Sequence, residues 1–217
     1  MNQINMQIKN LRVDFESLNL EKIQVDKSPI VQFIRWLENA LEAKINEPHA
    51  MTLSTANKKG QPDARVVLLR GVEKKGFSFF TNYKSAKGKE IVENKKVCLS
   101  FYWAELARQV RIKGVAVKLS AKNSDDYFES RPRESQISAW ASSQSEMIEN
   151  RDVLIKKYNE FEKKFENKKV PRPLHWGGYL VIPDSMEFWQ GRNNRLHDRI
   201  QYEKSKSGKW KIARLCP

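Results

Sequence analysis

The stretch from Trp176 to Arg199 holds the side chains best suited to chemistry in this chain of 217 residues. Residues 186–191 alternate with the two-residue period of a β-strand, and an Arg-Asn-Asn turn follows. If a second strand returns from that turn, Arg195, His197 and Arg199 project from one of its faces. Such a set can bind an anion, orient a polar substrate or move a proton. It is also what the solvated face of a hairpin carries, and spacing alone leaves both interpretations open.

Asp198 lies on the other face of the same expected strand, beside Leu196. That face should be apolar, and a carboxylate placed there needs a polar partner. We therefore expect a polar group to meet Asp198.

Two kinds of catalysis are disfavoured. His49, His175 and His197 do not lie at metal-ligand spacing, and the sequence has neither an HExxH motif nor a cysteine cluster. It also lacks the GxSxG turn of a serine hydrolase. Cofactor chemistry remains, because a bound ring needs an apolar slot with a few fixed polar groups and a phosphate needs cations or amides.

The elements that must position these residues are mostly strands with hairpin spacing. Strands are expected at 51–56, 64–70, 77–81, 97–103, 109–119, 176–182, 186–191, 196–203 and 209–214. Helices are expected at 28–43, 85–94, 123–130, 132–141 and 151–167. In the first of these, Ile30, Phe33, Ile34, Leu37 and Leu41 follow at helical spacing. Helices that occur singly between antiparallel strands predict a mainly β fold, an antiparallel barrel with peripheral α-helices.

The helix at 85–94 carries Lys87 and Lys89 in its first turn. Its N-terminal amides and these cations together could hold a phosphate. An ordinary basic surface helix has the same composition, so both interpretations stay open from the residues alone.

The chain has a formal net charge of +14, which favours anionic partners. Its Lys and Arg residues are spread along the sequence without a nucleic-acid-binding module, so sites for small phosphate ligands fit at least as well as nucleic acid. Two distant cysteines and the lack of an apolar export or membrane segment predict a cytoplasmic protein. We expect an N-terminal arm at 1–27, partly ordered, and a single domain at 28–217.

Eight motifs follow one another along most of the chain. In order, these are RVVLLR at 65–70, FFTNYKSAKGKEI at 79–91, RQVRIKG at 108–114, YFESRPRESQI at 127–137, SSQS at 142–145, VPRPLHWGGY at 170–179, EFWQG followed by RLHDR at 187–199, and the terminal WKIARLCP. Together they resemble the motifs of the pyridoxine (pyridoxamine) 5′-phosphate oxidase family. The resemblance implies a split antiparallel β-barrel, a homodimer and one FMN in each cleft between subunits.

The resemblance also implies roles for individual residues. FMN would be bound by Arg65, Val66, Val67, Leu68, Leu69, Arg70, Phe80, Thr81, Lys87, Gln109, Gln144, Ser145, Trp189 and Arg199. The substrate would be bound by Arg12, Arg70, Tyr127, Arg131, Ser135, Arg195, Leu196 and His197, of which Arg195 and His197 would be the catalytic pair.

Three positions depart from the family's pattern. Arg70 replaces a lysine that contacts the substrate phosphate, Ala86 replaces an arginine of the FMN-phosphate loop, and Phe15 replaces a tyrosine near Arg12. An arginine keeps the charge of a lysine but changes its reach and geometry.

The activity that the resemblance implies is oxidation of pyridoxamine 5′-phosphate and pyridoxine 5′-phosphate to pyridoxal 5′-phosphate, with O2 as acceptor and H2O2 as product. One alternative is a related split-barrel flavin reductase with another substrate. Another, from a different class, is a basic nucleic-acid-binding protein. A yellow purified protein would favour a flavoenzyme, whereas steeply salt-dependent binding would favour the nucleic-acid binder.

Overall fold

The computed structural model describes residue 20 and residues 25–217. The chain forms two compact units, and each is described by itself. The first unit consists of residues 1–48, 100–111 and 185–217, and the second of residues 49–99 and 112–184. Arg12, Phe15 and most of the expected N-terminal arm lie outside the described residues.

The described residues form nine strands in one sheet, with hydrogen-bonded order β2-β1-β5-β6-β7-β4-β3 and with β8 pairing β7 and β9. The strands are β1 (Ala50–Ala56), β2 (Pro62–Leu68), β3 (Gly71–Glu73), β4 (Gly76–Asn82), β5 (Lys96–Trp103), β6 (Arg108–Lys118), β7 (Trp176–Gln190), β8 (Asp198–Lys204) and β9 (Trp210–Leu215). The helices are α2 (Pro29–Glu42), α3 (Ala86–Glu93), α4 (Ala121–Glu129), α5 (Arg133–Ala141) and α6 (Arg151–Lys164). Short 3-10 turns occupy Ala104–Leu106 and Asn193–Arg195.

In the second unit, hairpins follow one another as the sequence predicts. Strand β1 pairs antiparallel with β2, placing Leu53 opposite Arg65, and β3 pairs with β4. Alternate side chains of β1 are buried, so one face of this hairpin belongs to the core and the other is free to line a site.

Two stretches of strand were predicted wrongly. The expected strand at 64–70 is β2, which ends at Leu68, and the short strand β3 that follows it was not predicted. The expected strands at 176–182 and 186–191 are a single strand, β7. Its residues Trp176–Val181 pair with β4 and its residues Ser185–Gln190 pair with β8. Pro183 lies between these two ladders, where its missing N–H interrupts neither of them. The proline was a misleading break signal because the backbone remains extended through it.

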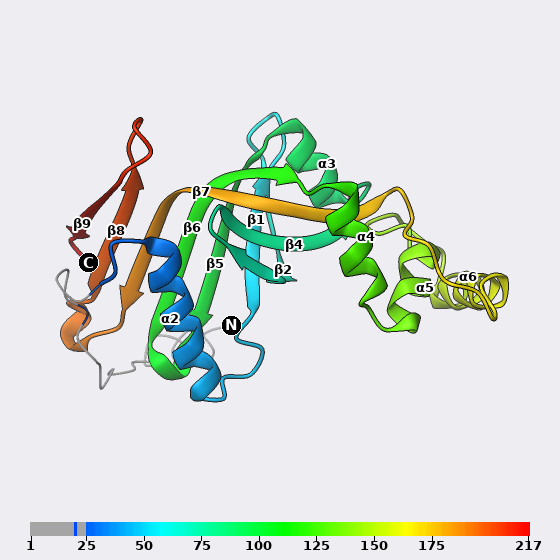
Figure 1. Ribbon diagram of the computed structural model, residues 1–217, viewed down its shortest axis with the longest axis horizontal. Coiled ribbons are helices and arrows are strands. Elements are labelled where there is room, and N and C mark those ends of the chain that lie inside the picture. Colours follow the sequence, from blue (N-terminus) through cyan, green and yellow to red (C-terminus); the bar gives the residue numbers. More distant parts are fainter. Residues whose placement is uncertain (1–19, 21–24) are drawn as a thin grey trace, which may run out of the picture. The chain divides into compact units, whose positions relative to one another are not determined.

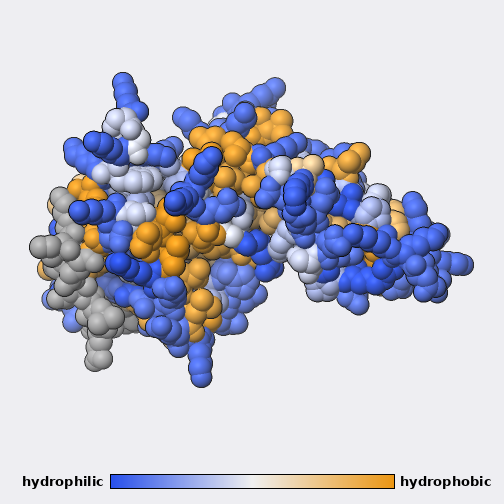
Figure 2. Space-filling view, viewed as in Figure 1, coloured by the Kyte–Doolittle hydropathy of each residue, from blue (hydrophilic) through white to orange (hydrophobic). Residues whose placement is uncertain are grey.

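Helices α4, α5 and α6 follow β6 in the second unit and precede β7 (Figure 1). Their apolar side chains share a small core of Phe128, Ile137, Phe165, Val170 and Trp176. Figure 2 shows hydrophilic side chains over the α6 end of this unit, as expected for a helix whose outer face is mostly Lys, Glu and Asn. None of the helices in the described part of the chain has both the length and the apolar character needed to cross a membrane.

In the first unit, α2 begins as predicted, with Ser28 as N-cap and Pro29 in the first turn. Its buried side is centred on Phe33, Trp36 and Ala40. The predicted inward positions Ile34 and Leu41 are exposed instead. The helix therefore turns its aromatic side to the core.

Asp198 has the polar partners that the sequence requires. Its Oδ1 accepts a hydrogen bond from Arg214 Nη1 at 2.6 Å, and its Oδ2 accepts one from the Leu20 N–H at 3.2 Å. Arg214 Nη2 also donates to the Leu20 carbonyl at 3.0 Å. This three-residue clamp, formed by Leu20, Asp198 and Arg214, ties Leu20 to β8 and β9.

Candidate functional site

The second unit contains a pocket of about 430 Å³, a size usual for small-molecule sites. It is lined by Arg65, Val66, Val67, Leu68, Arg70, Phe80, Thr81, Asn82, Lys87, Tyr127, Arg131, Ser138, Ala139, Ser142, Gln144 and Trp176. Four of these residues are cations, which is unusual for a cavity with so much apolar lining. The pocket is therefore suited to an anionic ligand with a flat or apolar body.

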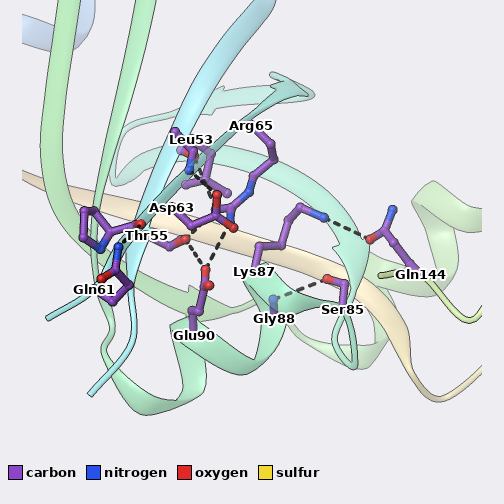
Figure 3. Close-up of polar contacts among 12 residues, drawn as sticks. Leu53, Thr55, Gln61, Asp63, Arg65, Ser85, Lys87, Gly88, Glu90 and Gln144 are labelled. Atoms are coloured by element: carbon purple, nitrogen blue, oxygen red, sulfur yellow. Dashed lines mark hydrogen bonds and ion pairs between the residues drawn. The ribbon is translucent and has the colours of Figure 1, made fainter. Parts of the chain in front are cut away.

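The first group of charges, the Arg65 cluster, consists of Asp63, Arg65, Lys87 and Glu90. Arg65 Nη2 pairs with Asp63 and with Glu90, the latter at 3.1 Å. Arg65 Nη1 donates to the Thr55 hydroxyl and to the Leu53 carbonyl, and Thr55 in turn donates to Glu90. Figure 3 shows these contacts converging from β1, β2 and α3. The guanidinium is thus held in one orientation.

Lys87 is the second cation of this cluster and is buried. Its Nζ donates to Gln144 Oε1 at 3.0 Å (Figure 3). The Thr81 hydroxyl donates to the same oxygen at 3.2 Å. Burial, and then the positive charge of Arg65, lowers the pKa of Lys87. An anion bound here would stabilise its charged form.

Helix α3 positions Lys87 through its N-terminal cap. The Ser85 side chain accepts a hydrogen bond from the Gly88 N–H at 3.3 Å. A Cβ at Gly88 would lie 2.3 Å from the Tyr83 carbonyl oxygen, so only glycine lets the first turn pack this closely. Lys87 therefore leaves the helix at its N-terminal end, where the helix dipole also favours an anion.

The second group of charges, the Arg131 pair, consists of Arg70 and Arg131. The Arg131 guanidinium lies over the Trp176 ring, 4.6 Å from its centroid, and 5.6 Å from that of Phe128. Its Nη1 is buried without a hydrogen-bond partner. Burial lowers the pKa of Arg131, and the charge of Arg70 lowers it further, while Tyr127 opposes the shift. A buried donor without an acceptor is costly unless a ligand supplies one.

Aromatic rings support this second group. Phe80 stacks on Tyr127 with centroids 3.9 Å apart and on Trp176 with centroids 5.5 Å apart. Gly178 makes room for this stack, because a Cβ there would lie 2.8 Å from Phe80 Cε1 and 2.5 Å from Leu119 Cδ1. The glycine at 178 in the HWGGY motif is therefore explained by the packing of this aromatic stack.

The first unit brings together other predicted residues. Trp189 and Arg199 are cross-strand partners in the β7–β8 ladder. Arg199 Nε donates to Glu187 Oε1 at 2.8 Å, and Arg111 donates to the other oxygen of the same carboxylate. Burial alone would raise the pKa of Glu187, but the hydrogen bonds from Arg199 and Arg111 outweigh it and lower the pKa. Glu187 therefore stays ionised and fixes Arg199.

His197 lies beside Trp189, with ring centroids 4.7 Å apart. Its Nδ1 is 3.0 Å from the Arg192 N–H and accepts its hydrogen bond, so the neutral imidazole carries its proton on Nε2. Burial, and then the charge of Arg195, lowers the pKa of His197. The ring is thus neutral at pH 7 and can donate from Nε2.

The expected strand face of Arg195, His197 and Arg199 was wrong. Strand β8 begins at Asp198, and Arg195 belongs to a 3-10 turn with φ of 60°. The left-handed backbone at Asn194 and Arg195 breaks the two-residue alternation, because strand periodicity holds only for extended residues.

The pocket collects many of the residues assigned by resemblance: Arg65, Val66, Val67, Leu68, Arg70, Phe80, Thr81, Lys87, Tyr127, Arg131 and Gln144. Leu69 is buried, and Leu69, Ser135 and Ser145 are not among the lining residues. Gln109, Trp189, Arg195, Leu196, His197 and Arg199 belong to the first unit. Arg12 lies outside the described residues.

Sequence reasoning missed several pocket residues, namely Asn82, Ser138, Ala139, Ser142 and Trp176. Trp176 could have been found, since it stands beside two glycines that make room for aromatic rings. Glu90 was also missed. Its place three residues after Lys87 on a helix puts both on one face, which was a usable signal.

Comparison with known proteins agrees with this geometry. The family profile described as pyridoxamine 5′-phosphate oxidase matches residues 37–165, and the one described as pyridoxine 5′-phosphate oxidase C-terminal dimerisation region matches residues 176–217. A pyridoxine/pyridoxamine 5′-phosphate oxidase of Nostoc punctiforme is 50% identical over 210 residues, covering 97% of this chain and 98% of that protein. One from Paraburkholderia phymatum is 50% identical, covering 97% of this chain and 99% of that protein.

Two solved structures resemble this one. PhzG from Burkholderia lata, in complex with tetrahydrophenazine-1-carboxylic acid, is 31% identical with a TM-score of 0.88, covering 94% of this chain and 100% of that chain. A pyridoxamine 5′-phosphate oxidase-related, FMN-binding protein from Nostoc punctiforme has a TM-score of 0.69 at 14% identity, covering 89% of this chain and 100% of that chain, and this likeness concerns the fold alone.

The fold is therefore a split antiparallel β-barrel with peripheral helices, as the sequence predicts, and the molecule is an oxidoreductase. More narrowly, the chain belongs to the pyridoxine/pyridoxamine 5′-phosphate oxidase family.

Proposed function

We propose that this enzyme oxidises pyridoxamine 5′-phosphate and pyridoxine 5′-phosphate to pyridoxal 5′-phosphate, using FMN as cofactor and O2 as acceptor and releasing H2O2. With the amine substrate, water is also consumed and the amino group leaves as ammonia. Family membership supports the reaction class, and the names of the relatives support the substrates. The matched C-terminal dimerisation region supports a homodimer. FMN at the subunit interface is part of the proposal and follows from the family resemblance.

One observation carries the proposal, namely that a single pocket is lined by two pairs of cations. Arg65 and Lys87 form one pair, and Arg70 and Arg131 form the other. The reaction brings together two phosphorylated molecules, and two such pairs are what two phosphates require. The unpartnered Nη1 of Arg131 is a donor suited to a phosphate oxygen.

The residues present fit an FMN. Arg65 and Lys87 would hold its phosphate with the N-terminal amides of α3, and Thr81 and Gln144 would position Lys87. The family resemblance assigns Gln109, Trp189 and Arg199 to its ring system. When bound, FMN would supply the acceptor for the hydride, with its two electrons, that leaves the substrate.

The remaining residues are assigned to the substrate. Arg70, Tyr127, Arg131 and Ser135 would bind its phosphate. Arg195 and His197 would orient the pyridine ring so that the reacting carbon is held in place. The neutral His197 can offer the hydrogen on Nε2 to a substrate oxygen or nitrogen.

The test is turnover with matched substrates. Purified protein with added FMN should consume pyridoxamine 5′-phosphate, take up O2 and release an equal amount of H2O2, whereas pyridoxamine without its phosphate should react poorly. Acid denaturation should release free FMN. His197→Ala should lose turnover while it retains its flavin. Equal turnover of both substrates would contradict a phosphate role for the Arg131 pair, and a colourless protein that neither binds FMN nor turns over would contradict the whole proposal.

A further inference from the structure

The Arg65 cluster contains as many carboxylates as cations. Arg65 and Lys87 contribute two positive charges, and Asp63 and Glu90 contribute two negative charges. All four lie within electrostatic reach of one another, since Asp63, Arg65 and Glu90 each shift the pKa of Lys87. The site assigned to a phosphate is therefore neutral overall before any ligand is counted.

Arg65 has little donor capacity left. A guanidinium has five N–H groups, and four of them belong to Nη1 and Nη2. Nη1 faces Leu53 and Thr55, and Nη2 faces Asp63 and Glu90, which leaves the Nε–H as the fifth. A phosphate that takes more than this donor has to displace one of these acceptors, and at Nη2 the acceptors are the carboxylates of Asp63 and Glu90.

Glu90 is the stronger of the two internal competitors. Its side chain is 17% exposed, against 51% for Asp63, so solvent screens its charge less. It lies one turn after Lys87 on α3, so the helix that presents the phosphate-binding lysine also presents a carboxylate to the same site (Figure 3).

We propose that Glu90 is an affinity-setting residue, an internal counter-anion that orients Arg65 and limits how tightly the site binds the cofactor phosphate. The inference rests on the proposed function, because it takes the anion at Arg65 and Lys87 to be the phosphate of FMN. It predicts that removing the charge while keeping the hydrogen bonds tightens the cofactor. In Glu90→Gln, the amide oxygen can still accept from Thr55 and Arg65.

The experiment measures the dissociation constants of FMN and of riboflavin for the full-length protein after the flavin has been removed by dialysis. Riboflavin has the same ring system and no phosphate. Glu90→Gln should lower the dissociation constant of FMN about tenfold and leave that of riboflavin unchanged. Asp63→Asn should act in the same direction by a smaller factor, about two- to threefold, because its carboxylate is more exposed.

A matched control comes from the same helix. Glu93 accepts a hydrogen bond from the Lys58 N–H outside the cluster, and Glu93→Gln makes the same change of net charge. It should leave both dissociation constants at the native values. Tightening by Glu93→Gln equal to that by Glu90→Gln would show a general charge effect and overturn the inference.

Lys87→Met distinguishes an error in the role of Glu90 from an error in the assignment of the phosphate site. If it weakens FMN while Glu90→Gln and Asp63→Asn leave FMN unchanged or weaker, the phosphate site stands and the role of Glu90 is wrong. If Lys87→Met leaves FMN affinity unchanged, the phosphate does not bind at this cluster, and the site assignment fails together with the inference.

Discussion

The two groups of cations in the pocket are held in place by different means. In the Arg65 cluster, carboxylates orient the guanidinium and cancel its charge. In the Arg131 pair, the face of Trp176 and the edge of the apolar core hold the guanidinium, and in the part of the chain that the structure describes no carboxylate pairs with it. An aromatic face attracts a cation without neutralising it.

The consequence is a difference in the net charge that each phosphate meets. A phosphate at the Arg131 pair meets two uncompensated positive charges. At the Arg65 cluster the four side chains sum to zero, and a further positive charge can come only from exposed lysines nearby, such as Lys84. We therefore expect single-residue changes at the Arg131 pair to have larger effects than those at the Arg65 cluster.

The largest effect is expected for Arg131→Ala. It removes a charge-assisted hydrogen bond worth roughly 1.5–3 kcal/mol, so the KM for pyridoxamine 5′-phosphate should rise about 10- to 100-fold. Because the contact persists in ground and transition states alike, kcat should change little. Steady-state kinetics measure KM and kcat. The control is Lys122→Ala, which removes an exposed cation on α4. A fall in kcat at unchanged KM would contradict the assignment.

Gly178→Ala should disturb the Arg131 pair through its aromatic support. The added Cβ would press on Phe80 and Leu119, and overpacking of this kind costs about 1–3 kcal/mol of unfolding free energy. Because Phe80 stacks on Tyr127, the KM of the substrate should rise more than the dissociation constant of FMN. Denaturant unfolding and the two binding measurements test this. If substrate and FMN binding weaken equally, the aromatic stack does not support the Arg131 pair more than the Arg65 cluster.

The pH dependence should also differ between the two groups. The pKa of Lys87 lies below its ordinary value of 10.5, so this lysine loses its charge earlier as pH rises, and FMN binding should weaken below pH 10.5. Guanidinium groups stay charged over this range, so the substrate KM should not rise with it. Riboflavin binding controls for titration of the flavin ring.

The same shift has a defined sign for stability. Without cofactor, the unfolded chain holds the Lys87 proton more tightly than the folded chain does. The free energy of unfolding should therefore increase with pH between the lowered pKa and 10.5. Lys87→Met should remove this increase, and its persistence would assign the titration to another group.

The smallest effect is expected for Ala86→Arg. The added cation should tighten FMN only about two- to threefold, because Lys84 is exposed in the same loop and can supply a charge. In the Lys84→Ala background the same change should tighten FMN about tenfold. A double-mutant cycle with coupling above about 0.5 kcal/mol would indicate a shared phosphate. If Lys84→Ala leaves FMN affinity unchanged in both backgrounds, Lys84 does not compensate for Ala86.

Much of this fold was predictable from local patterns. Helices α2 and α3 begin within one residue of their predicted starts, because a helix start depends on residues within a few positions of one another. The errors arose where strand pairing between residues distant in the sequence overrode a local sequence signal. Pro183 reads as a break, yet it lies between two ladders that the sequence does not reveal.

The candidate site was likewise predictable only in part. Motifs assigned Arg65, Lys87 and Arg131 to phosphates, and the fold brings all three to one pocket. What holds these cations was not predictable, because Glu90 reaches Arg65, and Trp176 reaches Arg131, only after strands and helices have packed. The roles assigned to all of these site residues stay predictions, as does the single domain at 28–217.

The clamp of Leu20, Asp198 and Arg214 has a consequence for how the chain is made. Leu20 and Arg214 are 194 positions apart, and Leu20 and Asp198 are 178 positions apart. Synthesis proceeds at about 5–20 residues per second, so Leu20 is incorporated roughly 10–40 s before Arg214. During that time the clamp around Leu20 is incomplete. The docking of Leu20 must be one of the last steps of folding, completed after the sheet that carries Asp198 has formed.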